Sequence, residues 1–338
     1  MKSMYELPAD KIAQKPPRRR GDTKLLILKR REGEIEDSRY ACLADWLKPG
    51  DLVVLNNTRV MPARLIATTQ SGARRELFLT ERHSSPLLAP VATVIYRGKL
   101  RVGDSLKVGQ DSIEVIEILP GGQARIRATV PPVVLAERSG LTPLPPYIKR
   151  SATKSDSVRY QTIFAARDGS VAAPTASLNM TSQLMKELKA SGITIAKLTL
   201  HVGRGTFMPI RDNIENHTMH QEYYSIPSST LQAIRRTKQA GGRIVAIGTT
   251  VTRALEHSAD RILSSDEPTI RDEADIFIYP GYDFQVVDVL LTNFHAPEST
   301  VLQLAAAFAG PGLLMKAYTY ALKSDYAFLS YGDSMLIV

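Results

Sequence analysis

The residues of this chain that can move protons lie in short motifs of its second half. They are His201, His217, His220, Glu222, His295 and Glu298. Imidazole changes its charge near neutral pH and a positioned carboxyl group can assist proton transfer, so all of them are candidate catalytic residues. The H-x-x-H spacing of His217 and His220 could in principle hold a metal ion, but no third strong ligand accompanies it. We therefore expect a hydrogen-bonded loop or an acid–base role there, and no metal. His201 and His295 could equally be structural.

Small and polar residues crowd several loops that follow apolar runs. Those that could bind a ligand are Asn57, Arg59, Thr175, Asn179, Gly203, Gly205, Thr206, Gly248, Thr249, Thr250, Asn293 and Phe294. Glycine lets a ligand approach the backbone, and a helix N-terminus offers free N–H groups to an anion. Ligands of open α/β sheets bind at the carboxyl ends of the strands, where these loops are expected. Taken singly, each loop could also be an ordinary turn or helix cap.

The elements that must position these loops change in character along the chain. Short apolar runs at 23–29 and 51–55 predict strands. From about residue 60 to 140, short β-type segments alternate with glycine turns and almost no helical pattern appears, which favours a small β-barrel or sandwich.

After the proline-rich segment 143–146, helical and strand patterns alternate. Helices are predicted at 182–190, 231–240 and 299–308, and strands at 193–201, 243–247 and 274–279. This alternation indicates an α/β fold, a mixed sheet with helices, interrupted by an inserted small β-barrel domain. We expect residues 1–60 and 145–338 to form the discontinuous α/β domain and residues 61–144 to form the insertion.

Composition is that of a soluble globular protein, and the net charge of +9 favours an anionic partner. Basic residues concentrate early, at Arg18, Arg19, Arg20 and Lys24, although a solvated basic face would look the same.

The longest apolar run, 301–310, is far shorter than the roughly 20 residues of a membrane span. Cys42 is the single cysteine, which excludes an intrachain disulfide. We expect a cytoplasmic, monomeric protein with no membrane contact.

Taken together, the motifs resemble one family, the S-adenosylmethionine:tRNA ribosyltransferase-isomerases (QueA) of the queuosine pathway. The matching segments include 56–60, 144–148, 171–176, 201–203, 205–207, 248–250, 292–295, 297–299 and 330–333, with His217, His220 and Glu222. The matches run in order over nearly the whole chain, and the weakest stretch lies from about 80 to 140.

The resemblance implies a reaction as well as a fold. S-adenosylmethionine, consumed as a co-substrate, would donate its ribosyl carbons to the aminomethyl group of a 7-deazaguanine in tRNA. Adenine and methionine would leave, and epoxyqueuosine would remain. A base next to the sulfonium and a proton donor for adenine are required, but the sequence does not assign the histidines and glutamates to these steps.

The chain departs from the family pattern at several positions, one of them Val251-Thr252-Arg253 in place of Ser-Val-Arg. Three other departures bear on function. The family continues Gly-Leu-His-Phe after Ala-Ala-Pro-Thr-Ala, whereas this chain has Ser177-Leu178-Asn179-Met180, and Arg204 replaces a small residue. Asparagine cannot shuttle a proton near neutral pH. If these loops share one pocket, the chain could instead be a paralogue that uses S-adenosylmethionine on a small-molecule acceptor or rearranges it without tRNA. A non-catalytic protein that binds tRNA or a nucleoside is a third hypothesis.

Overall fold

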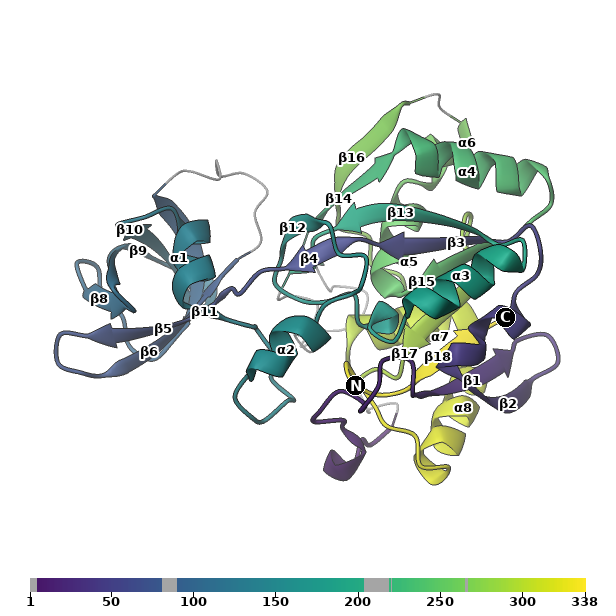
Figure 1. The fold of residues 1–338 in the computed structure, drawn as a ribbon, viewed down its shortest axis with the longest axis horizontal. Coiled ribbons are helices and arrows are strands. Elements are labelled where there is room, and N and C mark those ends of the chain that lie inside the picture. Colours follow the sequence, from purple (N-terminus) through teal and green to yellow (C-terminus); the bar gives the residue numbers. More distant parts are fainter. Residues whose placement is uncertain (1–4, 81–89, 204–218, 220, 265–266) are drawn as a thin grey trace.

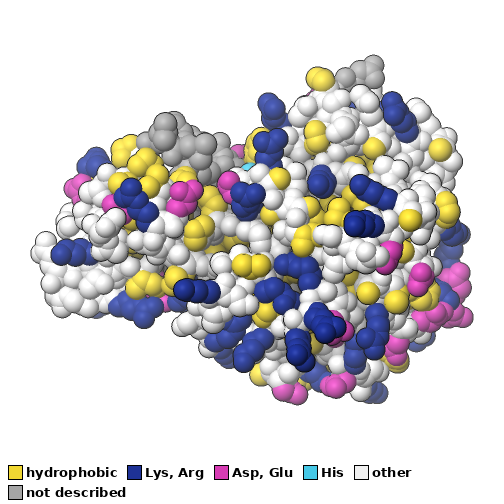
Figure 2. Space-filling model, viewed as in Figure 1, with side chains coloured by type: hydrophobic (Ala, Val, Ile, Leu, Met, Phe, Trp, Pro, Cys, Tyr) yellow, Lys and Arg dark blue, Asp and Glu magenta, His cyan; other side chains and the backbone are white. Residues whose placement is uncertain are grey.

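The structure, a computed structural model, describes residues 5–80, 90–203, 219, 221–264 and 267–338 (Figure 1). Within these residues, a large mixed sheet with helices forms one lobe and a small barrel forms the other. The barrel projects to one side of the larger lobe (Figure 2). The short parallel pair β4 (Thr58–Val60) and β12 (Arg167–Ser170) lies between the lobes.

The large sheet has nine strands within the described residues, in the order β16-β14-β13-β3-β15-β17-β18-β1-β2. Neighbours β13, β3, β15 and β17 are parallel to one another, and the outer pairs are antiparallel except β18 with β1. The bounds are β1 Lys24–Lys29, β2 Glu34–Arg39, β3 Leu52–Asn56, β13 Thr194–Leu200, β14 Glu222–Pro227, β15 Ile244–Ile247, β16 Thr269–Ala274, β17 Val289–Asn293 and β18 Ser334–Ile337.

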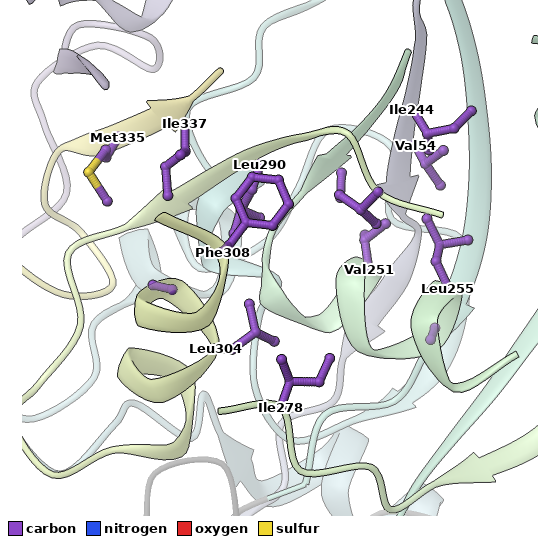
Figure 3. Packing of buried hydrophobic residues seen from close by; sticks show 14 of the residues in the cluster. Val54, Ile244, Val251, Leu255, Ile278, Leu290, Leu304, Phe308, Met335 and Ile337 are labelled. Atoms are coloured by element: carbon purple, nitrogen blue, oxygen red, sulfur yellow. The ribbon is translucent and has the colours of Figure 1, made fainter. Parts of the chain in front are cut away.

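Alternate residues of the central strands enter two different cores, because side chains alternate across a strand. Leu52 and Val54 face one core, whereas Val53 and Leu55 face the other. The first core lies against α4, α5, α6, α7 and α8, as Figure 3 shows for Val54, Val251 and Leu304. The second lies against η2 and α3. These helices are η2 Tyr40–Trp46, α3 Ser182–Ala190, α4 Ser228–Gln239, α5 Thr249–His257, α6 Ala259–Ser264, α7 Thr300–Ala309 and α8 Pro311–Lys323.

The smaller lobe is a closed barrel around its own apolar core. Its strands run in the order β5-β6-β7-β10-β9-β8, and β8 pairs back with β5 to close the ring. Closure leaves no unpaired edge among these strands. The bounds are β5 Arg64–Thr69, β6 Arg74–Leu79, β7 Val91–Arg97, β8 Ser105–Val108, β9 Asp111–Leu119, β10 Gln123–Ala128, α1 Pro132–Ser139 and β11 Gly140–Leu141.

The expected fold class is confirmed, and two local predictions are wrong. Residues 132–139 form α1, although almost no helical pattern was expected there. The strand predicted at 274–279 does not form, since β16 spans Thr269–Ala274. Beyond it, the Ile276 carbonyl oxygen accepts a hydrogen bond from the Arg253 side chain (3.4 Å) and Ile278 packs into the core. Because every strand of the barrel lies within 64–141, we propose the division into 1–60 with 145–338, and 61–144.

The apolar C-terminal helices are short. Among the described residues, no single helix is long and apolar enough to cross a membrane. Helices α7 and α8 reach that length and apolar character only together, and they are bent by 111° where they meet.

Candidate active site

Four parallel strands bring their carboxyl ends to one edge of the large sheet. At this edge β3 ends in Asn56, β13 leads into His201, β15 into Gly248, and β17 ends in Asn293. Parallel strands place their carboxyl ends together, so loops far apart in the sequence meet there. This edge is where the ligand-binding loops were expected.

A cavity of about 110 Å³ lies against this edge. Its described walls combine hydroxyl and amide groups with apolar side chains, and no Asp, Glu, Lys or Arg is among them. The lining residues are Tyr147, Ala173, Pro174, Thr175, Ala176, Val202, Gly248, Thr249, Thr250, Thr292, Asn293, Phe294, His295, Ala296, Ser299, Val301, Leu329 and Ser330.

Two helices begin at this cavity. Gly248 precedes α5 with φ 103°, a backbone conformation that glycine adopts without steric cost. Ser299 caps α7 by accepting a hydrogen bond from the Leu302 N–H (3.3 Å). The first N–H groups of a helix have no intrahelical partner and carry partial positive charge. The cavity therefore offers backbone donors to a carboxylate or another electron-rich group.

His295 is a buried titratable residue of the described cavity wall, and hydrogen bonds hold both its backbone and its ring. Its backbone N–H donates to Tyr318 Oη (2.8 Å), and its carbonyl oxygen accepts from the Tyr5 hydroxyl. Its Nε2 lies 2.7 Å from Thr292 Oγ1. Burial lowers the pKa of the imidazole to about 3, because the charged form would lose its hydration. His295 is therefore neutral at physiological pH.

Seven of the predicted residues line this cavity: Thr175, Gly248, Thr249, Thr250, Asn293, Phe294 and His295. Seven others, Asn57, Arg59, Asn179, His201, Gly203, Glu222 and Glu298, do not line it. The remaining four, Gly205, Thr206, His217 and His220, lie outside the described residues. Among the described residues, no cluster of His, Cys, Asp and Glu could hold a metal ion.

Glu222 lies in a second cavity that adjoins the first. The two cavities share Thr249, Thr250 and Val301 in their walls. One carboxylate oxygen of Glu222 pairs with Arg253, and the other accepts the Gly203 N–H (3.1 Å). The carboxylate is thus engaged by a buried cation and a backbone donor, which favours a positioning role over proton transfer.

Other predicted residues hold the loops in place. The Asn57 side chain accepts from Thr199 Oγ1 (2.7 Å), and Arg59 donates to the Ala165 carbonyl oxygen (3.1 Å). His201 is buried, with Nδ1 2.7 Å from Thr58 Oγ1.

Two further predicted positions are separate from the cavity. Glu298 is exposed at φ 59° on the turn before α7. Asn179 is buried, and Arg204 lies outside the described residues. Neither Ser177 nor Asn179 is in the described cavity wall, so the expectation that these departures share its pocket finds no support in the described geometry.

Several lining residues were not among the predicted site residues. Tyr147 and Ser330 contribute hydroxyl groups whose oxygens lie 2.6 Å apart. Both fall inside motifs that carry the family resemblance, which was the available signal. Val202, Leu329 and Val301 supply apolar wall, and nothing in their residue types distinguishes them from core residues.

The whole chain matches known proteins. Residues 2–337 match the family model described as "Queuosine biosynthesis protein". The chain belongs to this family. A relative from Pelodictyon phaeoclathratiforme, named S-adenosylmethionine:tRNA ribosyltransferase-isomerase, is 54% identical over 98% of both chains. A relative of the same name from Chlorobium chlorochromatii is also 54% identical over 98% of both chains.

A solved structure supports the same family membership. The crystal structure of S-adenosylmethionine tRNA ribosyltransferase from Thermotoga maritima is 33% identical, covers 99% of both chains and superposes with a TM-score of 0.58. The family resemblance noted from the motifs is thereby confirmed over the full length, including the barrel.

Proposed function

We propose that this protein is an S-adenosylmethionine-dependent ribosyltransferase-isomerase that acts on tRNA in queuosine biosynthesis. The observation that carries this proposal is the 54% identity over 98% of both chains to relatives of that name. The ribosyl carbons of S-adenosylmethionine would pass to the aminomethyl group of 7-aminomethyl-7-deazaguanine in tRNA. Adenine and methionine would be released and epoxyqueuosine formed.

The described cavity suits the chemical character of this co-substrate. Phe294, Val202 and Pro174 provide apolar surface for the adenine ring. Hydroxyl groups of Thr175, Thr292 and Ser330 can hydrogen-bond the ribose. The N-termini of α5 and α7 can receive the carboxylate of the methionine part.

A neutral His295 fits a sulfonium substrate. Burial disfavours the imidazolium form, so the ring adds no positive charge beside the cationic sulfur. A neutral imidazole offers one donor and one acceptor nitrogen, and Thr292 engages Nε2. We propose that His295 contacts the substrate and takes part in proton transfer, held in place by Thr292, Tyr318 and Tyr5.

Because tRNA is the proposed acceptor, we infer a cytoplasmic protein. That it acts as a monomer without a resident metal stays a prediction. The alternative, a small-molecule acceptor or rearrangement of S-adenosylmethionine without tRNA, has no support from the relatives, whose names specify tRNA.

The test is incubation of the protein with S-adenosylmethionine and tRNA that carries the aminomethyl-deazaguanine, followed by mass spectrometry of the digested nucleosides. We expect epoxyqueuosine together with adenine and methionine. tRNA that carries unmodified guanine is the control and should yield none. Consumption of S-adenosylmethionine at the same rate without tRNA would contradict the proposal in favour of the alternative.

A further inference from the structure

Two segments far apart in the sequence are joined near the cavity. The Gln14 side chain donates to the Tyr147 carbonyl oxygen (3.0 Å) and accepts the Lys149 N–H (2.9 Å). Arg159, at the end of α2 (Lys154–Arg159), donates to the Pro17 carbonyl oxygen (2.7 Å). Residues 14–20 and 147–161 therefore form one continuous surface, fixed by long-range hydrogen bonds.

This surface exposes five cations, Lys15, Arg18, Arg19, Lys149 and Lys154. None of the five forms an ion pair with a residue that the structure describes. The nearby acids are already engaged, since Asp156 is buried against Arg150 (2.7 Å) and Asp22 lies 3.8 Å from Arg39. Figure 2 shows Lys and Arg side chains gathered on this face, around the position of α2 and the N-terminal segment. We call these five residues the basic surface.

Two cationic side chains of residues 18–24, those of Arg20 and Lys24, are hydrogen-bonded to the protein's own backbone. Arg20 donates to the carbonyl oxygens of Gln161 (2.9 Å) and Leu178 (2.6 Å). Lys24 donates to those of Ser324 (3.0 Å) and Asp325 (3.0 Å). Their charges hold loops together, so the free charge of this face comes from both joined segments and not from the N-terminal run alone.

The basic surface lies next to the cavity. Tyr147 lines the cavity, and Lys149 follows it by two residues, which places their Cα atoms within about 7 Å. A polynucleotide that delivers one nucleoside to the cavity must carry the phosphates on either side of that nucleoside past the cavity mouth. Unpaired Lys and Arg side chains are the groups that neutralise such phosphates.

We propose that the basic surface binds the backbone phosphates of the RNA strand whose modified base enters the cavity. This inference rests on the proposed function and specifies how the tRNA substrate is held. Lys149 would contact a phosphate close to the reacting nucleotide, and Lys15, Arg18, Arg19 and Lys154 would contact the strand farther out. The contacts are with phosphate, so they contribute affinity and not base specificity.

The experiment measures the affinity for tRNA over a salt series with the triple variant Arg18→Ala/Arg19→Ala/Lys149→Ala. Each lost phosphate contact should reduce the steepness of log affinity against log salt by about 0.7–0.9, so the slope of the triple variant should be shallower by about 2–3. KM for tRNA should rise by about tenfold or more at low salt, whereas KM for S-adenosylmethionine should not change. The unchanged KM shows that the cavity is intact.

A matched control removes three exposed lysines at the amino edge of the sheet and on α3. Lys48→Ala/Lys186→Ala/Lys189→Ala changes the net charge by the same amount and should keep the wild-type slope. If both triple variants lose the same slope, or the first loses none, the basic surface does not bind the RNA phosphates. Formation of epoxyqueuosine by the wild type would show that the proposed function still holds in that case. If the wild type makes no epoxyqueuosine, but the salt dependence of tRNA binding is reduced in the first variant and not in the control, the proposed function fails and the proposed phosphate-binding surface holds.

Discussion

Glu222 and Arg253 form an ion pair inside the protein, with side chains only 2% and 6% exposed. Glu222 also accepts the Gly203 N–H, and Arg253 donates to the Ala274 carbonyl oxygen (2.9 Å). The pair therefore ties α5 to the outer strands β14 and β16 and to the backbone just after β13. Both side chains line the second cavity, and Arg253 lies on the same helix as Thr249 and Thr250, which line both cavities.

We predict that Glu222→Ala strongly destabilises the protein. Removing one partner leaves the Arg253 guanidinium buried without its counter-charge, which costs about 3–5 kcal/mol. Urea unfolding of the wild type and variant would measure the loss. Replacing both residues, as Glu222→Gln/Arg253→Met, should cost much less than the single change. If the free energy of unfolding of Glu222→Ala lies within about 0.5 kcal/mol of the wild-type value, the ion pair does not stabilise this part of the fold.

A second prediction concerns binding at His295. Replacing His295 with alanine should weaken binding of S-adenosylmethionine by at least about tenfold, because the ring forms part of the cavity and orders Thr292. Calorimetry would measure the affinity. The variant Glu298→Ala is the matched control, since Glu298 is exposed and absent from the described wall, and it should bind as wild type. Equal affinity of His295→Ala and wild type would remove His295 from the binding site.

A third prediction concerns the pH dependence of stability that His295 causes. Its pKa is lowered from 6.5 to about 3 by burial, so the unfolded chain binds a proton in this pH window that the folded chain does not. The stabilisation of the folded state that His295 provides should thus be lost progressively as the pH falls from 6.5 towards 3. Chemical unfolding at several pH values should show a shallower dependence in His295→Gln, which has no proton to take up. An identical pH dependence would mean that the folded protein accommodates the charged ring.

A fourth prediction concerns Ser177, one of the departures from the family pattern. Its side chain is fully buried, and its Oγ has no hydrogen-bond partner among the described residues. A buried unsatisfied hydroxyl costs about 1–3 kcal/mol, so Ser177→Ala should stabilise the protein by about 1 kcal/mol. Thermal or urea unfolding would measure this, and KM for S-adenosylmethionine should stay unchanged because Ser177 is not in the described wall. Destabilisation would indicate that the hydroxyl has a partner in solution.

A fifth prediction concerns Asp156, which lies beneath the basic surface. Burial alone would raise the pKa of this carboxyl, but hydrogen bonds from Arg150, Thr153 and Tyr331 outweigh it and lower the pKa well below 3.8. The ionised form therefore stabilises the fold above about pH 4, and this stabilisation is lost as pH falls through the lower folded value. Asp156→Asn should lower stability at pH 7 by about 3 kcal/mol and flatten the acid limb of the stability curve. An unchanged acid limb would contradict this role.

The sequence alone determined the features that depend on local pattern. The apolar runs 23–29 and 51–55 became β1 and β3, and Ser182–Ala190 became α3, because short apolar runs and helical periodicity are patterns of a few neighbouring residues. The Gly248-Thr249-Thr250 and Asn293-Phe294-His295 motifs could be placed at the site because strand ends in parallel sheets meet at one edge. Motif order also identified the family.

The tertiary structure decided which polar groups face a ligand and which face the protein. Glu222 is committed to Arg253, Asn57 to Thr199, and Arg20 to backbone carbonyl oxygens, although their residue types suggest binding or catalysis. A partner 31 residues away for Glu222, or 141 for Arg20, leaves no periodic trace in the sequence. The same holds for the surface that joins residues 14–20 to 147–161, since hydrogen bonds between distant segments form only when the whole chain has folded.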